Sequence, residues 1–303
     1  MNSDLIVTNN YDDLIEAALM GVTNKHTYRA YRRWLRSFLD YHNRLGSPPI
    51  TRTEIQGFLS SLISAGKSPQ SANQALSAIK RLAEVLVDYQ FIDETTAARI
   101  ERTKGMKVLG RKTGSWLTER QAADLVNNPD DSLRGLRDRA VLAVAYGCGL
   151  RRTEIATLRF ENLQYIAPED KWVFQVKGKH NRTREIVLGQ SVKVHLDRWI
   201  AAAELEAGYI FPAMDKNTEE LYDQPMHPNT VYKIVKRNAE HLGLNAAPHD
   251  LRRSFALNSW KNGEGAHIVQ IQKNLGHQSL ATTEGYMNVG YDYKGAPSNF
   301  LEF

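Results

Sequence analysis

Five short segments in the second half of the chain carry residue types that together suit chemistry on an anionic group. In sequence order they are GLRRTEI, KGKHNR, HDLRR, LGH and a tyrosine nine residues after the last histidine. Guanidinium groups hold anionic oxygens through planar, bidentate hydrogen bonds, a role for which arginine is better suited than lysine. A histidine can take up a proton near neutral pH, and a deprotonated phenol can act as a nucleophile. The candidate residues are Arg151, Lys179, His249, Arg252, His277 and Tyr286.

Each of these residues also has an ordinary structural explanation when it is considered alone. Arg151 could pair with Glu154 at the start of a helix, and Gly178 could supply a positive φ in a polar hairpin turn. His277, directly after a glycine, could cap a helix or pack in the core, and one tyrosine among 13 is usually structural. The order and spacing of all five segments argue instead for one site.

The matching strings resemble the tyrosine recombinase (phage integrase) family, of the simple two-domain Xer-like type. They are GLRRTEI, KGKHNRTREIVL, HDLRRSFA and LGHQSLATTEGYM, and the resemblance extends from Trp116 to about Asn288. It implies a site-specific DNA recombinase that cleaves and rejoins DNA without ATP, metal or any other cofactor. In this chemistry a tyrosine hydroxyl attacks the scissile phosphodiester, and a 3′-phosphotyrosine forms while a 5′ hydroxyl leaves.

The resemblance assigns a role to each candidate residue. Arg151 and Arg252 would bind the non-bridging oxygens, with His277 as a further donor, because attack concentrates negative charge there. Tyr286 would be the nucleophile. Since a tyrosine has a reference pKa of about 10, it needs a base, for which His249 is the candidate.

Two further residues complete the assignment. Alignment of the strand that ends in REIVL places Lys179 as the acid that protonates the leaving 5′ oxygen, with Lys177 as the alternative. Glu154 matches the acidic position of the family and would orient a neighbouring arginine or histidine. The covalent intermediate conserves the energy of the phosphodiester, so that another 5′ hydroxyl can reseal the strand.

Several neighbours of these residues could be mistaken for them. Tyr291 and Tyr293 lie near Tyr286, which alone keeps the family's distance from His277. By register, Arg152 and Arg253 are expected to contact the DNA backbone or to support the site, and Arg253 replaces a histidine that is common there. A metal site is disfavoured because the two histidines lack a third ligand at suitable spacing.

The elements that must position this site fall into two segments joined by a basic linker. Residues 1–104 show apolar positions at three- and four-residue steps, with a capping box at Thr51 and Glu54, and predict a helical bundle. Residues 105–115 form the predicted linker. Residues 116–303 predict a larger catalytic domain, mainly helical, with antiparallel strands at 163–178 and 183–189 and a helix over 153–160. The expected fold class is therefore mainly α, with a SAM-like core-binding domain before the catalytic domain.

Composition limits the class of protein without identifying it. The 303 residues carry a net charge of +5, of which residues 105–115 contribute +3 and residues 116–303 nothing. The single cysteine, Cys148, excludes an internal disulfide framework and suits a reducing compartment. No apolar run approaches the ~20 residues that span a membrane, and the polar N-terminus is unlike a secretory signal. We expect a cytoplasmic protein with no membrane partner.

The predicted partners are double-stranded DNA and further copies of the chain. The segment from His227 to Leu244 resembles the family helix that enters the major groove. Family members act as a dimer on each site and as a tetramer on two duplexes, and their C-terminal tail docks on a neighbouring protomer; here the tail could equally pack on its own domain. The expected DNA contacts are Lys107, Arg111, Lys112, Lys177, Arg182, Asn229, Thr230, Lys233 and Arg237.

Two alternative functions share features of this sequence. A type IB topoisomerase-like enzyme would use the same nicking and closing chemistry without strand exchange. A non-catalytic DNA-binding protein could retain a relic of the site, although the intact set from Arg151 to Tyr286 argues against it. Integration, excision, dimer resolution and inversion all use this core, so the sequence leaves the biological role and the DNA target open.

Overall fold

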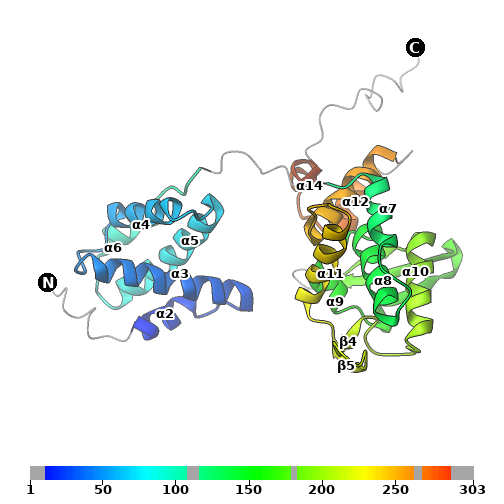
Figure 1. The fold of residues 1–303 in the computed structure, drawn as a ribbon. Helices are drawn as coiled ribbons and strands as arrows, with labels where there is room; N and C mark the ends of the chain where they lie inside the picture. Colours follow the sequence, from blue (N-terminus) through cyan, green and yellow to red (C-terminus); the bar gives the residue numbers. More distant parts are fainter. Residues whose placement is uncertain (1–10, 108–115, 179–182, 263–267, 288–303) are drawn as a thin grey trace, which may run out of the picture. The chain divides into compact units, whose positions relative to one another are not determined.

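The computed structural model divides the chain into two compact units, residues 1–112 and 113–303 (Figure 1). It describes residues 11–107, 116–178, 183–262 and 268–287. Both units are mainly helical, and the second also contains small antiparallel sheets. The fold class predicted from the sequence is confirmed.

The described part of the first unit is a bundle of five helices. Their apolar stripes meet in one core, in which Leu35, Phe38, Ile79 and Leu82 are almost completely buried. Side-chain caps fix the helix starts: Asn24 accepts hydrogen bonds from the next helix at 3.0 Å. The helices are α2 (Tyr11–Leu19), α3 (Lys25–Arg44), α4 (Arg52–Ser64), α5 (Pro69–Asp88) and α6 (Glu94–Glu101).

The capping box predicted at Thr51 is only half formed. The Thr51 hydroxyl accepts a hydrogen bond from the backbone N–H of Glu54 at 3.3 Å. The Glu54 carboxylate, however, turns into the bundle, where its Oε1 lies 2.6 Å from Nδ1 of the fully buried His42. A buried imidazole and a buried carboxylate each need a partner, and this pairing replaces the reciprocal half of the box.

The start of the predicted linker is attached to the first unit. Residues 103–107 have no regular secondary structure. Asn73 on α5 nevertheless holds both backbone groups of Met106, accepting from its N–H at 2.7 Å and donating to its carbonyl at 3.0 Å. The chain therefore leaves the bundle beside the N-terminal part of α5. Residues 108–115 lie outside the described part.

The second unit is organised around one central helix. The residues of α8 from Ala140 to Ala145 are all buried, and α8 contacts α7, α9, α10, α11 and α12. Trp199 on α10 fills the core beside it and donates to the carbonyl of Ile210 at 2.8 Å. The helices of this unit are α7 (Glu119–Asn127), α8 (Leu133–Gly147), α9 (Arg152–Ala156), α10 (Gln190–Ala202), α11 (Pro228–His241), α12 (Pro248–Asn262), α13 (Ile268–Leu275) and α14 (Leu280–Met287).

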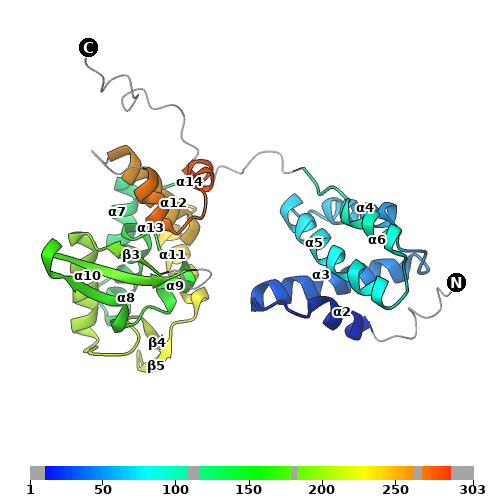
Figure 2. The same cartoon turned by 180° about the vertical axis from the view of Figure 1, so that it is seen from behind.

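The predicted strands form a three-stranded antiparallel sheet. Its order is β1 (Leu163–Ile166), β2 (Lys171–Lys177) and β3 (Thr183–Val187), with Val173 opposite Val187 and Lys177 opposite Thr183. Strand β3 passes beside α13 (Figure 2). A second sheet, β4 (Pro212–Met214) with β5 (Leu221–Pro225), was not predicted, because strands this short carry little alternation of apolar and polar residues.

The helix predicted over 153–160 is wrong in its second half. Helix α9 ends at Ala156, and the next residues pair with a distant segment instead. The backbone carbonyl of Leu158 accepts from the N–H of Ile210 at 2.9 Å, and Arg159 bridges to Tyr209. Tertiary pairing supplies the backbone hydrogen bonds that a continued helix would have supplied, so the apolar periodicity was misleading here.

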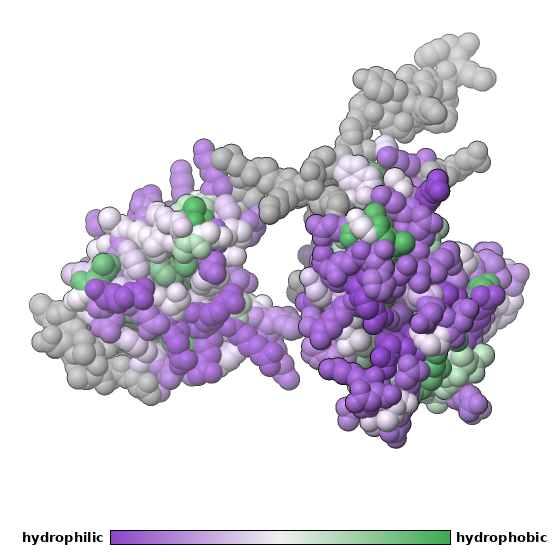
Figure 3. Space-filling model, viewed as in Figure 1, coloured by the Kyte–Doolittle hydropathy of each residue, from purple (hydrophilic) through white to green (hydrophobic). Residues whose placement is uncertain are grey.

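The surface of the second unit is strongly polar on the face that carries α11. Hydrophilic side chains cover most of that face, with small apolar patches between them (Figure 3). Among the helices that the structure describes, none has both the length and the apolar character needed to cross a membrane.

Candidate active site

Arg151 reaches the site because α8 ends in a tight turn. Cys148 caps the helix, and Gly149 follows in the left-handed conformation with φ of +60°. A Cβ at Gly149 would lie 2.5 Å from the ring of Phe255 on α12, so both the backbone angle and the close packing require glycine. Arg151 then stands directly before α9 as its N-cap residue, with about a third of its side chain exposed.

The carboxylate of Glu154 holds Arg151 in place from one turn further along α9. Oε1 accepts from Nη1 of Arg151 at 2.8 Å, and Oε2 accepts from its backbone N–H at the same distance. Burial by itself would raise the pKa of Glu154, but hydrogen bonds and charges from Arg184 and Arg151 lower it below its usual value. Glu154 is therefore a carboxylate at neutral pH, and the predicted orienting contact with an arginine is present.

Arg252 is buried in the middle of the unit, although it carries a charge. Only 2% of it is exposed. Its Nη1 donates to the carbonyl of Gly149 at 2.5 Å, and its Nη2 donates to the carbonyl of Leu275. These contacts join the turn after α8 to the end of α13. Arg252 therefore fixes the segment that precedes Arg151 and the segment that precedes His277.

His277 lies next to Arg252 at the start of the segment that leads to α14. Its Nε2 is 3.4 Å from Nη2 of Arg252, and its Nδ1 is 3.0 Å from Oγ1 of the buried Thr283. Burial and the guanidiniums of Arg252, Arg151 and Arg184 lower the pKa of His277 to about 4. The imidazole is therefore neutral at physiological pH.

His249 stands one helical turn before Arg252, at the start of α12, and is exposed. Partial loss of hydration and the charges of Arg252 and Arg151 lower its pKa below the ordinary value. A histidine with a lowered pKa is neutral near pH 7, which is the protonation state that a general base requires.

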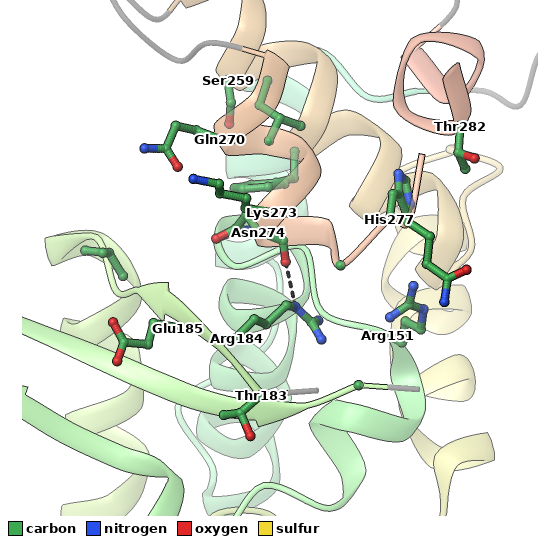
Figure 4. Close-up of a pocket in the computed structure, with 16 residues that line it drawn as sticks. Arg151, Thr183, Arg184, Glu185, Ser259, Gln270, Lys273, Asn274, His277 and Thr282 are labelled. Carbon is green, nitrogen blue, oxygen red and sulfur yellow. Dashed lines mark hydrogen bonds between the residues drawn. The ribbon is translucent and has the colours of Figure 1, made fainter. Parts of the chain in front are cut away.

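Arg151 and His277 line one cleft of about 1200 Å³ between β3 and helices α12 and α13 (Figure 4). The structure thus brings together Arg151, Glu154, Arg252 and His277 from three separate segments. Positive charge dominates this group, since two arginines and a neutral histidine surround one carboxylate.

One residue of this cleft, Arg184, was missed as a site residue by the sequence analysis. It lies on β3 and bonds to Glu154 and to the carbonyl of Asn274. Strand alternation was the signal that could have found it, because Arg184 points to the same side as the buried Ile186.

The remaining predicted site residues are only partly described. Tyr286 lies in α14, but its side chain is outside the described part, as are Lys179, Arg182, Arg111 and Lys112. Lys107 and Lys177 are exposed. On α11, Asn229, Lys233 and Arg237 are exposed at four-residue spacing, with Thr230 partly buried beside them. Arg237 also bonds to the buried Asp138 on α8.

Metal ligands do not gather in the part of the chain that the structure describes. Within it, no three His, Cys, Asp or Glu side chains stand close enough together to hold an ion. Cys148 is buried, and burial raises the pKa of its thiol to about 12.

Comparison with known sequences decides the family. A sequence model described as the phage integrase family matches residues 115–292, and one described as its N-terminal SAM-like domain matches residues 16–90. The chain belongs to the phage integrase family. Its enzyme class, tyrosine-type site-specific recombinase, is confirmed with it.

Similar proteins cover both units of this family member. The tyrosine recombinases XerA of Pyrococcus horikoshii and Pyrococcus furiosus are 29% and 30% identical to it, over 88% of this chain and 84% of theirs. The tyrosine recombinase XerD of Haemophilus influenzae is 27% identical over 88% of both chains. The Xer-like resemblance is confirmed by these relatives.

Solved structures share the fold. A XerH recombinase bound to its difH substrate superposes with a TM-score of 0.67 and 19% identity, over 94% of this chain and 82% of that one. A lambda integrase dimer bound to a core site gives a TM-score of 0.67 and 20% identity, over 96% and 79%. At this level of identity the structures support the fold alone.

Proposed function

We propose that this recombinase cleaves and rejoins double-stranded DNA with Tyr286 as the nucleophile and Arg151, Arg252 and His277 as the groups that hold the scissile phosphate. The observation that carries the proposal is that Arg151 and His277 line one cationic cleft, while the buried Arg252 contacts His277. Helix α14, which bears Tyr286, begins three residues after His277.

The proposed reaction is a transesterification in which the charge on phosphorus is the main difficulty. The phenolate of Tyr286 attacks phosphorus, a bond from the tyrosine oxygen forms, and the bond to the 5′ oxygen breaks. Arg151 and Arg252 donate to the non-bridging oxygens, and donors of this kind contribute roughly 2.7–4 kcal/mol each. Neutral His277 adds a hydrogen bond without adding a charge that would have to be desolvated.

Protons move at two places in this scheme. His249, whose pKa is lowered by partial desolvation and the nearby arginines, accepts the phenol proton. Lys179 gives a proton to the leaving 5′ oxygen, with Lys177 as the alternative donor. The reverse reaction, with a 5′ hydroxyl from another strand, reseals the DNA, and no ATP is consumed because the phosphotyrosine retains the ester bond.

The DNA duplex is the proposed partner of both units. Several relatives of known structure are bound to DNA sites. In this chain, the exposed row of Asn229, Lys233 and Arg237 on α11 suits a groove, and Lys107 suits a phosphate contact. We further propose a dimer on each site, a tetramer on two duplexes, a domain division at residues 105–115, and action in the cytoplasm.

A nicked suicide substrate tests the proposed nucleophile. The nick lets a short fragment diffuse away after cleavage, so that the covalent protein–DNA adduct accumulates and can be measured by denaturing electrophoresis. Wild type should form the adduct, and Tyr286→Phe should form none. Tyr291→Phe and Tyr293→Phe are the matched controls and should retain it.

Two results would contradict the proposal. An adduct formed by Tyr286→Phe would move the nucleophile to another residue, and absence of the adduct in wild type on its own recombination site would refute the enzymatic function. Exchange of strands between two labelled duplexes distinguishes recombination from simple nicking and closing, which only relaxes supercoils.

A further inference from the structure

Arg184 uses all three of its side-chain nitrogens inside the protein. Nη1 and Nη2 donate to Oε1 and Oε2 of Glu154 at 3.2 and 2.8 Å. Nε donates to the backbone carbonyl of Asn274 at 2.8 Å, the contact drawn as a dashed line in Figure 4. Only 11% of the side chain is exposed. An arginine held this way is pre-organised rather than mobile, because each of the three nitrogens of its planar fork donates to a fixed acceptor.

The first consequence concerns the charge of Arg151. Glu154 bonds to Arg151 as well as to Arg184, so one carboxylate is shared by two guanidiniums. A simple pair of Arg151 and Glu154 would be neutral, and a neutral pair is a poor ligand for a phosphate. With Arg184 added, the cluster carries a net charge of +1, and Arg151 retains attraction for an anion in the cleft.

The second consequence concerns the position of His277. The carbonyl that Arg184 binds belongs to Asn274, three residues before His277. The side chain of Arg184 also lies close to Gly276. An added Cβ on Gly276 would lie 3.3 Å from Cδ and Nη1 of Arg184. Arg184 therefore contacts the turn from which the imidazole projects.

We propose that Arg184 is a positioning residue of the recombinase: it balances the charge of Glu154 and holds the turn before His277, so that Arg151 and His277 face the same phosphate. The inference rests on the proposed function and extends it to a strand residue that makes no bond to DNA in this role. Its effect passes through Glu154 on one side and through the backbone of α13 on the other.

Single-turnover cleavage of the suicide substrate at saturating enzyme measures this role, with the DNA Kd determined separately. Arg184→Ala should lower the cleavage rate constant about 10- to 100-fold, the range expected when a reacting group is displaced by about 1 Å, and should leave Kd within about threefold. Arg184→Lys should recover part of the rate, since it restores the charge but not the fork.

A double-mutant cycle tests whether Arg184 acts through Glu154. If it does, Glu154→Gln combined with Arg184→Ala should cleave no more slowly than the slower single variant. Losses that multiply would overturn the proposal, and so would a wild-type rate in Arg184→Ala.

Arg134 provides the matched control. At the far end of α8 it also binds a carboxylate, that of Glu219, and backbone carbonyls, those of Asp215 and Lys216. Arg134→Ala should lower stability but keep the cleavage rate constant of the folded enzyme. Equal rate losses in Arg134→Ala and Arg184→Ala would show a merely structural role.

A spectroscopic readout decides the inference even without catalysis. In protein labelled with ¹⁵N-histidine, the ring signals of His277, assigned with His277→Gln, should move in Arg184→Ala and stay in Arg134→Ala. Unchanged signals in Arg184→Ala would overturn the proposal. Absence of a wild-type adduct together with moved signals would instead refute the proposed function and retain the positioning contact.

Discussion

Arg252 and His277 come together although 25 residues separate them in the chain, with Nη2 of the arginine 3.4 Å from Nε2 of the histidine. A guanidinium only donates hydrogen bonds, so Nε2 is the acceptor in this contact and Nδ1 carries the proton toward Thr283. Because the Thr283 hydroxyl can donate as well as accept, it is also a partner for the other neutral tautomer of His277, in which Nδ1 is the acceptor. In that other tautomer, in which Nε2 carries the proton, an anionic oxygen placed between the two side chains would accept from both.

Removal of Arg252 should destabilise the second unit as well as stop cleavage. Arg252→Ala leaves the carbonyls of Gly149 and Leu275 without these donors in the interior, which should lower the free energy of unfolding by about 2–4 kcal/mol. Urea unfolding followed by circular dichroism measures the change. The exposed neighbour Arg152 is the control, and Arg152→Ala should differ from wild type by less than about 0.5 kcal/mol. If Arg252→Ala and wild type had equal free energies of unfolding, the buried contacts of Arg252 would not stabilise the unit.

The lowered pKa of His277 should appear as a pH dependence of stability. Between pH 6.5, the ordinary value, and about 4, the unfolded chain binds a proton at this residue that the folded protein does not. The contribution of His277 is therefore fully present above pH 6.5 and is lost as the pH falls toward 4. The Tm of wild type should fall more steeply from pH 7 to pH 5 than that of His277→Gln, which has no titrating group there. Parallel curves would show an unshifted histidine.

Gly276 and Gly243 form a matched pair for the contact with Arg184. Both are left-handed, with φ of +62° and +66°, so alanine at either position costs roughly 1–2 kcal/mol of backbone strain. A Cβ at Gly243 meets nothing within 4 Å, whereas at Gly276 it crowds Arg184. Gly276→Ala should therefore slow single-turnover cleavage, and Gly243→Ala should not. If both variants cleave at the wild-type rate, contact with Gly276 does not affect catalysis.

The proposed acid can be identified with a DNA substrate that carries sulfur at the 5′ bridging position. A thiolate leaves without being protonated, since the pKa of a thiol is far below that of an alcohol. Lys179→Ala should cleave ordinary DNA about 10²- to 10⁴-fold more slowly and should regain most of the rate on the sulfur substrate. Lys177→Ala should show no such rescue. Rescue of Lys177→Ala alone would transfer the role to Lys177.

Local sequence signals were sufficient to predict most helices and strands. They failed where a residue bonds to a distant segment rather than to its neighbours in the chain. The apolar positions at three- and four-residue steps within residues 1–104 predict helices such as α3 and α5 correctly, because this signal is contained in a few neighbouring residues. The end of α9 was missed because Leu158 bonds to Ile210, 52 residues away. The Glu54 carboxylate likewise does not complete the predicted capping box, because it bonds to the buried His42 on another helix.

The sequence alone determined the family, the mainly helical fold class and the candidate residues from Arg151 to Tyr286, because residue type and order along the chain are enough for a motif match. Only the tertiary structure decided which of these charged side chains contact one another. Glu154 divides its carboxylate between Arg151 and Arg184, and Arg252 ties Gly149 to Leu275. Such contacts join segments that are 30 and more than 100 residues apart, and electrostatic energy depends on distance in space and on burial rather than on position in the sequence.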